Sequence, residues 1–83
     1  MPIRVLLIED DEDDYFLTLD CIESIPDAEY VVDWVSNGMH AADGKVDFEK
    51  YDVVLCDYRV GGVTGVEIVA AAIAQGVHTP LFC

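Results

Sequence analysis

Short, nearly unbroken apolar runs separated by helix-length stretches constrain the fold of this chain more than any other feature. Runs of this kind are typical of strands that are buried on both faces of a parallel sheet, rather than of strands with one face in water. They occupy Ile3 to Ile8, Val53 to Cys56 and Pro80 to Cys83. The segment Tyr30 to Val35 contains strand-forming residues around one charged side chain, Asp33, as an edge strand does. The sequence therefore predicts four strands.

Helical periodicity occupies the stretches between these strands. We expect a helix from about Asp13 to Ser24, where apolar residues recur at three- and four-residue spacing. A weaker helix is expected from Ser36 or Asn37 to about Val46, and a stronger one from about Gly65 to Gln75. On the last helix, the stripe expected to face the core is Val66, Val69, Ala70 and Ile73.

The alternation β-α-β-α-β-α-β predicts an α/β fold, a doubly wound parallel sheet with right-handed crossovers and helices on both faces. With 83 residues, the chain is expected to form one domain, residues 1–83. In open parallel sheets, ligands bind beyond the carboxyl ends of the strands. Functional residues are therefore expected just after Ile8 and just after Cys56.

The charge of the chain limits its partners. It has 17 acidic and 4 basic residues, a net charge of −13, yet 53% of its residues are hydrophobic, which indicates a folded domain. An acidic surface repels phosphate backbones and anionic lipids, so we expect no direct nucleic-acid or membrane binding by this segment. No apolar run approaches the ~20 residues of a membrane span, and we expect a cytoplasmic protein. The three cysteines have no CxxC spacing and are expected to be reduced thiols.

Acidic residues follow two of the predicted strands directly. Glu9 and Asp10 come after the first apolar run, and Asp57 comes after Cys56. If these strands are neighbours, the three side chains converge at one edge of the sheet. Two carboxylates about 4 Å apart repel by about 4 kcal/mol at an effective dielectric near 20, so such a cluster needs a proton or a cation. Mg²⁺ is the expected ligand, because it prefers oxygen donors and keeps positions open for phosphoryl oxygens.

These segments resemble the receiver domains of response regulators in two-component signalling. Leu6 to Asp11 is similar to their first strand and acid pair, and Val53 to Glu67 is similar to their phosphoacceptor strand and loop. The resemblance implies a flavodoxin-like receiver fold with Asp57 as the phosphoacceptor. It further implies that Asp10 binds Mg²⁺ directly, that Glu9 acts mainly through water, and that the backbone carbonyl of Arg59 is a further metal ligand.

The resemblance also implies a function and its partners. The chain would be a phosphoacceptor module of a phosphorelay, a signalling domain rather than an enzyme, catalysing at most its own phosphorylation and dephosphorylation. Its phosphoryl donor would be a sensor histidine kinase or a phosphotransfer protein, and phosphorylation would regulate a partner or a fused output domain.

Two departures from the receiver pattern stand out. Gly61 occupies a loop position where most receivers have proline. The sequence also ends at Cys83, before the hydroxyl residue of the fourth strand and the lysine of the fifth strand that receivers carry. We therefore expect the N-terminal portion of a receiver, without the fifth strand and the last two helices, and an exposed sheet edge that favours self-association.

Other interpretations of the acidic residues lead to different functions. A receiver-like scaffold domain would use the fold without phosphoryl transfer. A Mg²⁺-dependent phosphatase would need a general acid two residues after Asp57, where this sequence has Arg59. The run from Glu9 to Asp14 does not match a calcium-binding EF-hand loop, because it lacks the required glycine. We expect Asp11 to Asp14 to be a solvated helix start.

Overall fold

A four-stranded parallel sheet with the strand order β2-β1-β3-β6 forms the centre of the structure, a computed structural model that describes residues 1–83. The strands are β1 (Ile3–Ile8), β2 (Tyr30–Val35), β3 (Val53–Cys56) and β6 (Leu81–Phe82). Each neighbouring pair is parallel, and β1 lies between β2 and β3. The predicted strands and the parallel sheet are thus confirmed, with β2 at an edge.

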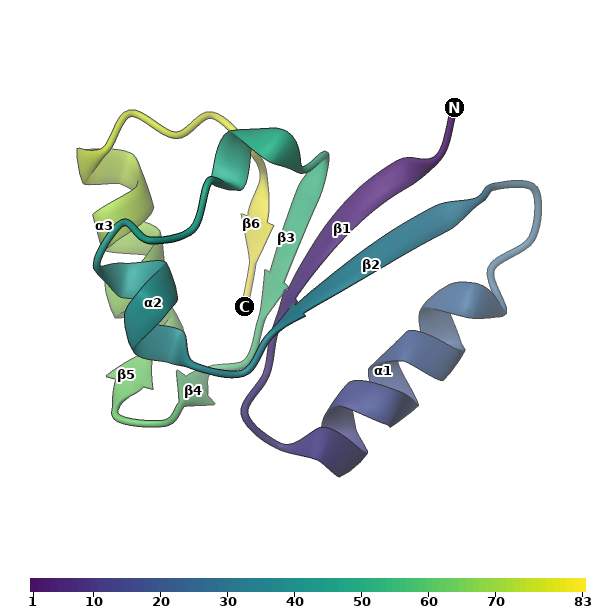
Figure 1. The fold of residues 1–83 in the computed structure, drawn as a ribbon, viewed down its shortest axis with the longest axis horizontal. Coiled ribbons are helices and arrows are strands. Elements are labelled where there is room, and N and C mark those ends of the chain that lie inside the picture. Colours follow the sequence, from purple (N-terminus) through teal and green to yellow (C-terminus); the bar gives the residue numbers. More distant parts are fainter.

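Helices cover both faces of this sheet (Figure 1). Helix α1 (Glu12–Glu23) lies on one side, and α2 (Gly38–Ala42) and α3 (Gly65–Ala74) lie on the other. A short 3₁₀ turn, η1 (Phe48–Lys50), precedes β3. This arrangement is the doubly wound, flavodoxin-like α/β fold that the alternation of elements predicted. No helix in the chain combines the length and the apolar character needed to cross a lipid bilayer.

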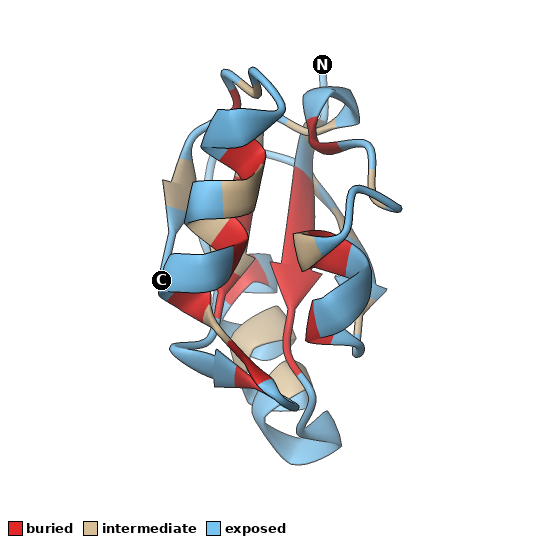
Figure 2. Ribbon diagram, turned by 90° about the vertical axis from the view of Figure 1, so that its left-hand side faces the viewer, coloured by how far each residue is buried: buried red, intermediate tan, exposed pale blue.

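The main core lies between the sheet and the helices α2 and α3. Figure 2 shows the buried residues on the strands and on the inward sides of the helices, with exposed residues outside. Alternate residues of a strand point to opposite faces. Leu6 and Ile8 of β1 and Val54 of β3 are fully buried in one cluster with Phe48 and Ile68. The strands that end at the acidic residues are therefore among the most tightly packed parts of the molecule.

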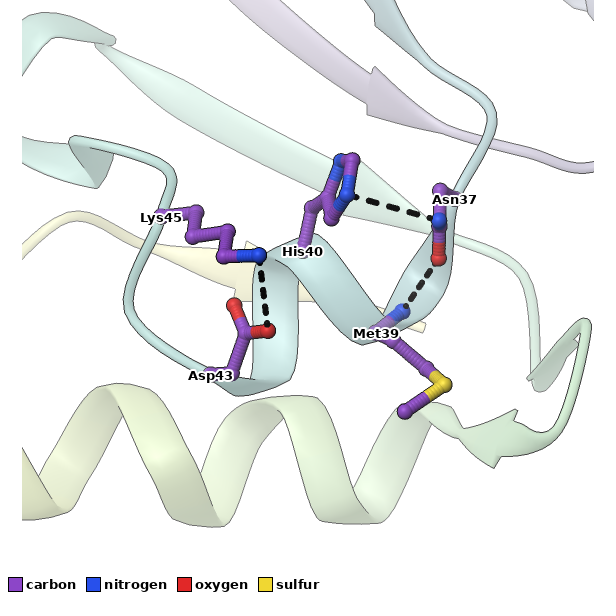
Figure 3. Close-up of polar contacts among 5 residues, drawn as sticks. All are labelled: Asn37, Met39, His40, Asp43 and Lys45. Atoms are coloured by element: carbon purple, nitrogen blue, oxygen red, sulfur yellow. Dashed lines mark hydrogen bonds and ion pairs between the residues drawn. The ribbon is translucent and has the colours of Figure 1, made fainter.

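Helix α2 is shorter than the sequence indicated. The side chain of Asn37 caps its start by accepting the Met39 N–H at 3.0 Å, and the amide of Asn37 lies 3.5 Å from the His40 ring nitrogen (Figure 3). The helix ends at Ala42 because Gly44 adopts a φ of +84°, which ordinary helical residues do not. An exposed ion pair of 3.8 Å between Lys45 and Asp43 lies at this end.

The predicted core stripe of α3 is wrong. The buried residues of this helix are Gly65, Ile68 and Ala72, whereas Val66 and Ile73 are 67% and 70% exposed. Because the helix is apolar almost all round, its periodicity does not distinguish the face that packs. The start of the helix packs closely, since a Cβ on Gly65 would lie only 2.9 Å from the Cys83 sulfur.

A small antiparallel hairpin, not expected from the sequence, follows β3. It consists of β4 (Arg59–Val60) and β5 (Val63–Thr64), and leads directly into α3. Val60 and Val63 are buried in the core cluster, so their side chains fix the hairpin to the core. Gly61 and Gly62 form its turn. This hairpin carries the loop beside Asp57.

A disulfide joins Cys56 and Cys83, so the expectation of reduced thiols is wrong for these residues. The register pairs Leu55 with Phe82, which places Cys56 and Cys83 side by side at the ends of β3 and β6, with Cα atoms 4.7 Å apart. Spacing along the sequence did not reveal this pairing, because it depends on how two strands align. Cys21 is free and exposed.

We predict that the Cys83→Ser variant unfolds more easily than the oxidised wild type, because the disulfide closes a 27-residue separation and restricts the unfolded chain. The expected loss in the free energy of unfolding is about 2–4 kcal/mol, measured by urea denaturation. Cys21→Ser is the matched control and should unfold like the wild type. Alkylation of all three cysteines in the non-reduced native chain would contradict the prediction.

Candidate metal and phosphoacceptor site

The pairing of β1 with β3 creates the candidate site. Ile8 and Cys56, the last residues of the two strands, lie opposite each other, and the Asp57 N–H continues the ladder by donating to the Ile8 carbonyl at 3.1 Å. On the other side, the Glu9 N–H donates to the Val35 carbonyl of β2 at 3.0 Å. The residues that follow the two central strands therefore start from fixed backbone positions at one edge of the sheet.

Glu9, Asp10 and Asp57 come together at this edge and are called the acid cluster below. One carboxylate oxygen from each lies within 4.8 Å of the other two. Glu9 is buried, with 7% of its surface exposed, whereas Asp10 and Asp57 are exposed. The structure thus brings together the three carboxylates that the sequence placed after neighbouring strands.

Backbone N–H groups hold each carboxylate of the acid cluster. Glu9 Oε1 accepts the Asp11 N–H at 3.1 Å, and Asp57 Oδ1 accepts the Tyr58 N–H at 2.8 Å. Asp10 Oδ2 accepts the Gly61 N–H from the β4–β5 turn at 2.9 Å. Hydrogen bonds from N–H groups to a carboxylate favour its charged form. The second oxygen of each carboxylate makes no hydrogen bond within the chain.

Gly61 has a role in this site that sequence reasoning missed. Its φ is +64°, a conformation that glycine adopts readily and other residues adopt at a cost. Its N–H binds Asp10, and proline has no N–H to offer. The departure from the receiver pattern at this position therefore adds a hydrogen bond to the acid cluster. Nothing in the sequence pointed to it beyond the Gly61-Gly62 pair.

Trp34 is a second neighbour that the sequence did not assign to the site. Its indole Nε1–H donates to the main-chain carbonyl of Glu9 at 2.6 Å. Its ring stacks on Tyr15 of α1, with the ring centroids 4.1 Å apart. The contact with Glu9 depends on the alignment of β2 with β1, which residue spacing does not provide.

The pKa of Glu9 is raised above its ordinary value. Burial is the largest cause, and the negative charges of Asp57, Asp14 and Asp10 raise it further, while the hydrogen bond from Asp11 opposes the rise. Burial and the neighbouring negative charges both disfavour the charged carboxylate of Glu9. A cation placed between the carboxylates would reverse the effect of the neighbouring charges. A positive ion bound at the acid cluster would therefore reduce the repulsion between its carboxylates.

The remaining acids of the run Glu9 to Asp14 form the start of α1. Asp11 is the N-cap and accepts the N–H groups of Asp13 at 2.8 Å and Asp14 at 3.2 Å. Acidic residues in the first turn of a helix interact favourably with its dipole. These residues are exposed, as a solvated helix start requires.

Arg59 begins β4, two residues after Asp57, and pairs with Thr64 in the hairpin. Its side chain is exposed and takes part in no salt bridge. The assignment of its backbone carbonyl as a metal ligand stays a prediction, since it is based on the family resemblance alone.

Together, fold and site define a class. Three clustered carboxylates at the carboxyl end of a parallel α/β sheet can hold a metal ion, because hard divalent cations prefer carboxylate oxygens and the donors lie within 4.8 Å of one another. The order of strands and helices and the place of the acids resemble those of response-regulator receiver domains.

Sequence comparison agrees with this class. The chain is homologous to the response regulator RppA of Synechocystis sp., with 30% identity over 80 residues, 95% of the chain and 33% of the relative. It is 32% identical over 79 residues to the transcriptional regulatory protein TcrA of Mycobacterium tuberculosis, covering 95% of the chain and 30% of TcrA. The chain thus spans about a third of the length of these curated relatives. No protein-family model matches the chain.

We predict that Glu9→Gln stabilises the chain at neutral pH when no divalent cation is present. A raised pKa means that the folded chain binds the Glu9 proton more tightly than the unfolded chain does. The contribution of Glu9 to stability is therefore greatest at low pH, and it falls as the pH rises from 4.5 through the raised pKa. The variant should gain a few degrees in Tm at pH 7 and lose this advantage at pH 4, by differential scanning calorimetry. A gain that is the same at both pH values would contradict the assignment.

We also predict that Gly61→Ala costs about 1–2 kcal/mol of stability, because alanine is strained at a φ of +64°. Gly62→Ala is the matched control, since both glycines have open space where a Cβ would lie but Gly62 has no positive φ. Urea denaturation of the two variants measures the difference. Equal free energies of unfolding would show that the turn is not held in this conformation.

Proposed function

We propose that this chain is a phosphoacceptor receiver of a two-component phosphorelay, with Asp57 as the residue that takes the phosphoryl group. The observation that carries the proposal is the acid cluster, three carboxylates with donor oxygens within 4.8 Å at the ends of the adjacent strands β1 and β3. The homology to response regulators supports it independently.

The geometry of Asp57 suits a nucleophile. Its side chain is exposed, Oδ1 is held by the Tyr58 N–H, and the other oxygen has no partner within the chain. A phosphohistidine of a sensor histidine kinase or a phosphotransfer protein would be the donor. In an in-line displacement, a carboxylate oxygen of Asp57 forms a bond to phosphorus while the phosphorus–nitrogen bond of the phosphohistidine breaks, and the freed imidazole takes up a proton.

The metal that we propose for the acid cluster is Mg²⁺, held by carboxylate oxygens of Asp10 and Asp57 and by the carbonyl of Arg59, with Glu9 acting mainly through water. When bound, it neutralises the negative charge that would otherwise repel an incoming phosphate. Gly61 and Tyr58 orient the carboxylates of Asp10 and Asp57 through their N–H groups. The chain is thus a signalling module that modifies itself, rather than an enzyme that turns over many substrates.

Phosphorylation would act on a partner or an output domain. An aspartyl phosphate adds negative charge and acceptor oxygens to Asp57, next to the β4–β5 hairpin and α3. The hairpin and α3 follow the modified residue directly along the chain, and we propose that the change is read there. The net charge of −13 disfavours direct contact with nucleic acid, and we propose that the chain acts in the cytoplasm.

The test is phosphorylation of the full chain by acetyl phosphate and MgCl₂, followed by intact mass spectrometry. We predict a single phosphoryl adduct that hydroxylamine removes, as it does with acyl phosphates, and that Asp57→Asn abolishes. Asp13→Asn is the matched control, since Asp13 is an exposed acid of the α1 start and should leave the adduct unchanged.

Two other outcomes would point to other functions. A folded chain that forms no adduct would contradict phosphoryl transfer and favour the scaffold interpretation of the fold. Continuous release of phosphate from several phosphomonoesters, without a stable adduct, would indicate a phosphatase.

A further inference from the structure

Trp34 links the acid cluster to helix α1. It is the next-to-last residue of β2, and its Nε1–H donates to the Glu9 carbonyl at 2.6 Å. The other side of the contact is Tyr15 of α1, whose ring lies 4.1 Å from the Trp34 ring, centroid to centroid, at an interplanar angle of 8°. Trp34 is thus stacked on a helix that begins three residues after Glu9 and hydrogen-bonded to Glu9 itself.

The hydrogen bond from Trp34 fixes the orientation of one peptide unit. The Glu9 carbonyl and the Asp10 N–H belong to the same planar group, so holding the carbonyl oxygen sets the plane of the Glu9–Asp10 peptide. The Glu9 N–H is held as well, by the Val35 carbonyl. Both backbone groups of Glu9 are therefore bound to β2, and the direction in which Asp10 leaves the strand is set by Trp34.

This constraint matters because Asp10 is exposed and follows Glu9, the last residue of this segment whose N–H is bonded to β2. Its side chain reaches Gly61 on the hairpin, at the far side of the acid cluster. Without the indole contact, the Glu9 carbonyl would lose its hydrogen bond and the Glu9–Asp10 peptide would be less restrained, so the carboxylates would spend less time in one arrangement. A ligand that needs all of them would then have to order the peptide when it binds.

We propose that Trp34 is a positioning residue for the acid cluster, and that the stack on Tyr15 holds its indole in place. The inference rests on the proposed function for the identity of the cation, Mg²⁺. Trp34 does not touch the cation in this account. It acts through the main chain of Glu9, and its indole is the only tryptophan of the chain.

The size of the effect follows from the value of one hydrogen bond. A typical intramolecular hydrogen bond changes an equilibrium by between about twofold and tenfold. Trp34→Phe keeps an aromatic ring for Tyr15 to stack on and removes only the N–H donor. It should therefore weaken Mg²⁺ binding by that factor. Tyr15→Leu removes the stack and leaves the donor in place, so its Mg²⁺ affinity should stay closer to that of the wild type.

The experiment is a titration of the full chain with MgCl₂, followed by isothermal titration calorimetry and by tryptophan fluorescence. In the wild type, Mg²⁺ should shift the emission of Trp34, and the shift should give the same Kd as calorimetry. Asp10→Asn should remove both signals. Circular dichroism of Trp34→Phe and Tyr15→Leu verifies that the variants are folded.

The outcomes separate this inference from the proposed function. If the wild type forms the Asp57 adduct and Trp34→Phe binds Mg²⁺ as tightly as the wild type does, the positioning role alone is overturned. An emission of Trp34 that does not respond to bound Mg²⁺ would contradict the link between Trp34 and the acid cluster. A wild type that takes up neither Mg²⁺ nor a phosphoryl group would overturn the proposed function and this inference together.

Discussion

The parallel pairing of β1 with β3 is the interaction on which the rest of the site depends. Val5 to Ile8 of β1 and Val54 and Cys56 of β3 are buried, and helices lie on both faces of the sheet, so water competes little for the backbone hydrogen bonds between these strands. The register ends both strands at the same level, and the Asp57 N–H bonded to the Ile8 carbonyl extends it by one residue. A shift of one residue would turn the side chains of β3 to the opposite face and separate Asp57 from Glu9 and Asp10.

The carboxylates of the acid cluster repel one another, and a bound cation would reduce this repulsion. Burial raises the pKa of Glu9, and the nearby carboxylates add to the rise, in a chain with a net charge of −13. A fold selected for stability alone would not place a buried carboxylate beside two others. Binding of an ion to the folded chain and not to the unfolded one adds to stability by mass action. In the proposed function, the repulsion between the carboxylates and their affinity for a metal have the same physical origin.

Much of the fold and the acid cluster could be predicted from sequence, because both depend on short-range patterns. Buried apolar runs identify the central strands, and acids directly after them identify the edge where they meet. The length of α2 could not be predicted, because it depends on the positive φ of Gly44. The buried face of α3 could not be predicted either, because this helix is apolar nearly all round. The Cys56–Cys83 disulfide and the contacts of Gly61 and Trp34 with the acid cluster come from the alignment of distant segments. Only the tertiary structure determines these.

The most direct test of the central claim is to determine where a divalent cation binds on this acidic surface. Backbone NMR spectra recorded with substoichiometric Mn²⁺, which broadens amide signals close to it, give the answer residue by residue. The account predicts broadening centred on the amides of Glu9, Asp10, Asp57 and Gly61, with the amides of Asp43 and Asp47 unaffected. Broadening spread evenly over the exposed acids, with no centre at the ends of β1 and β3, would contradict it.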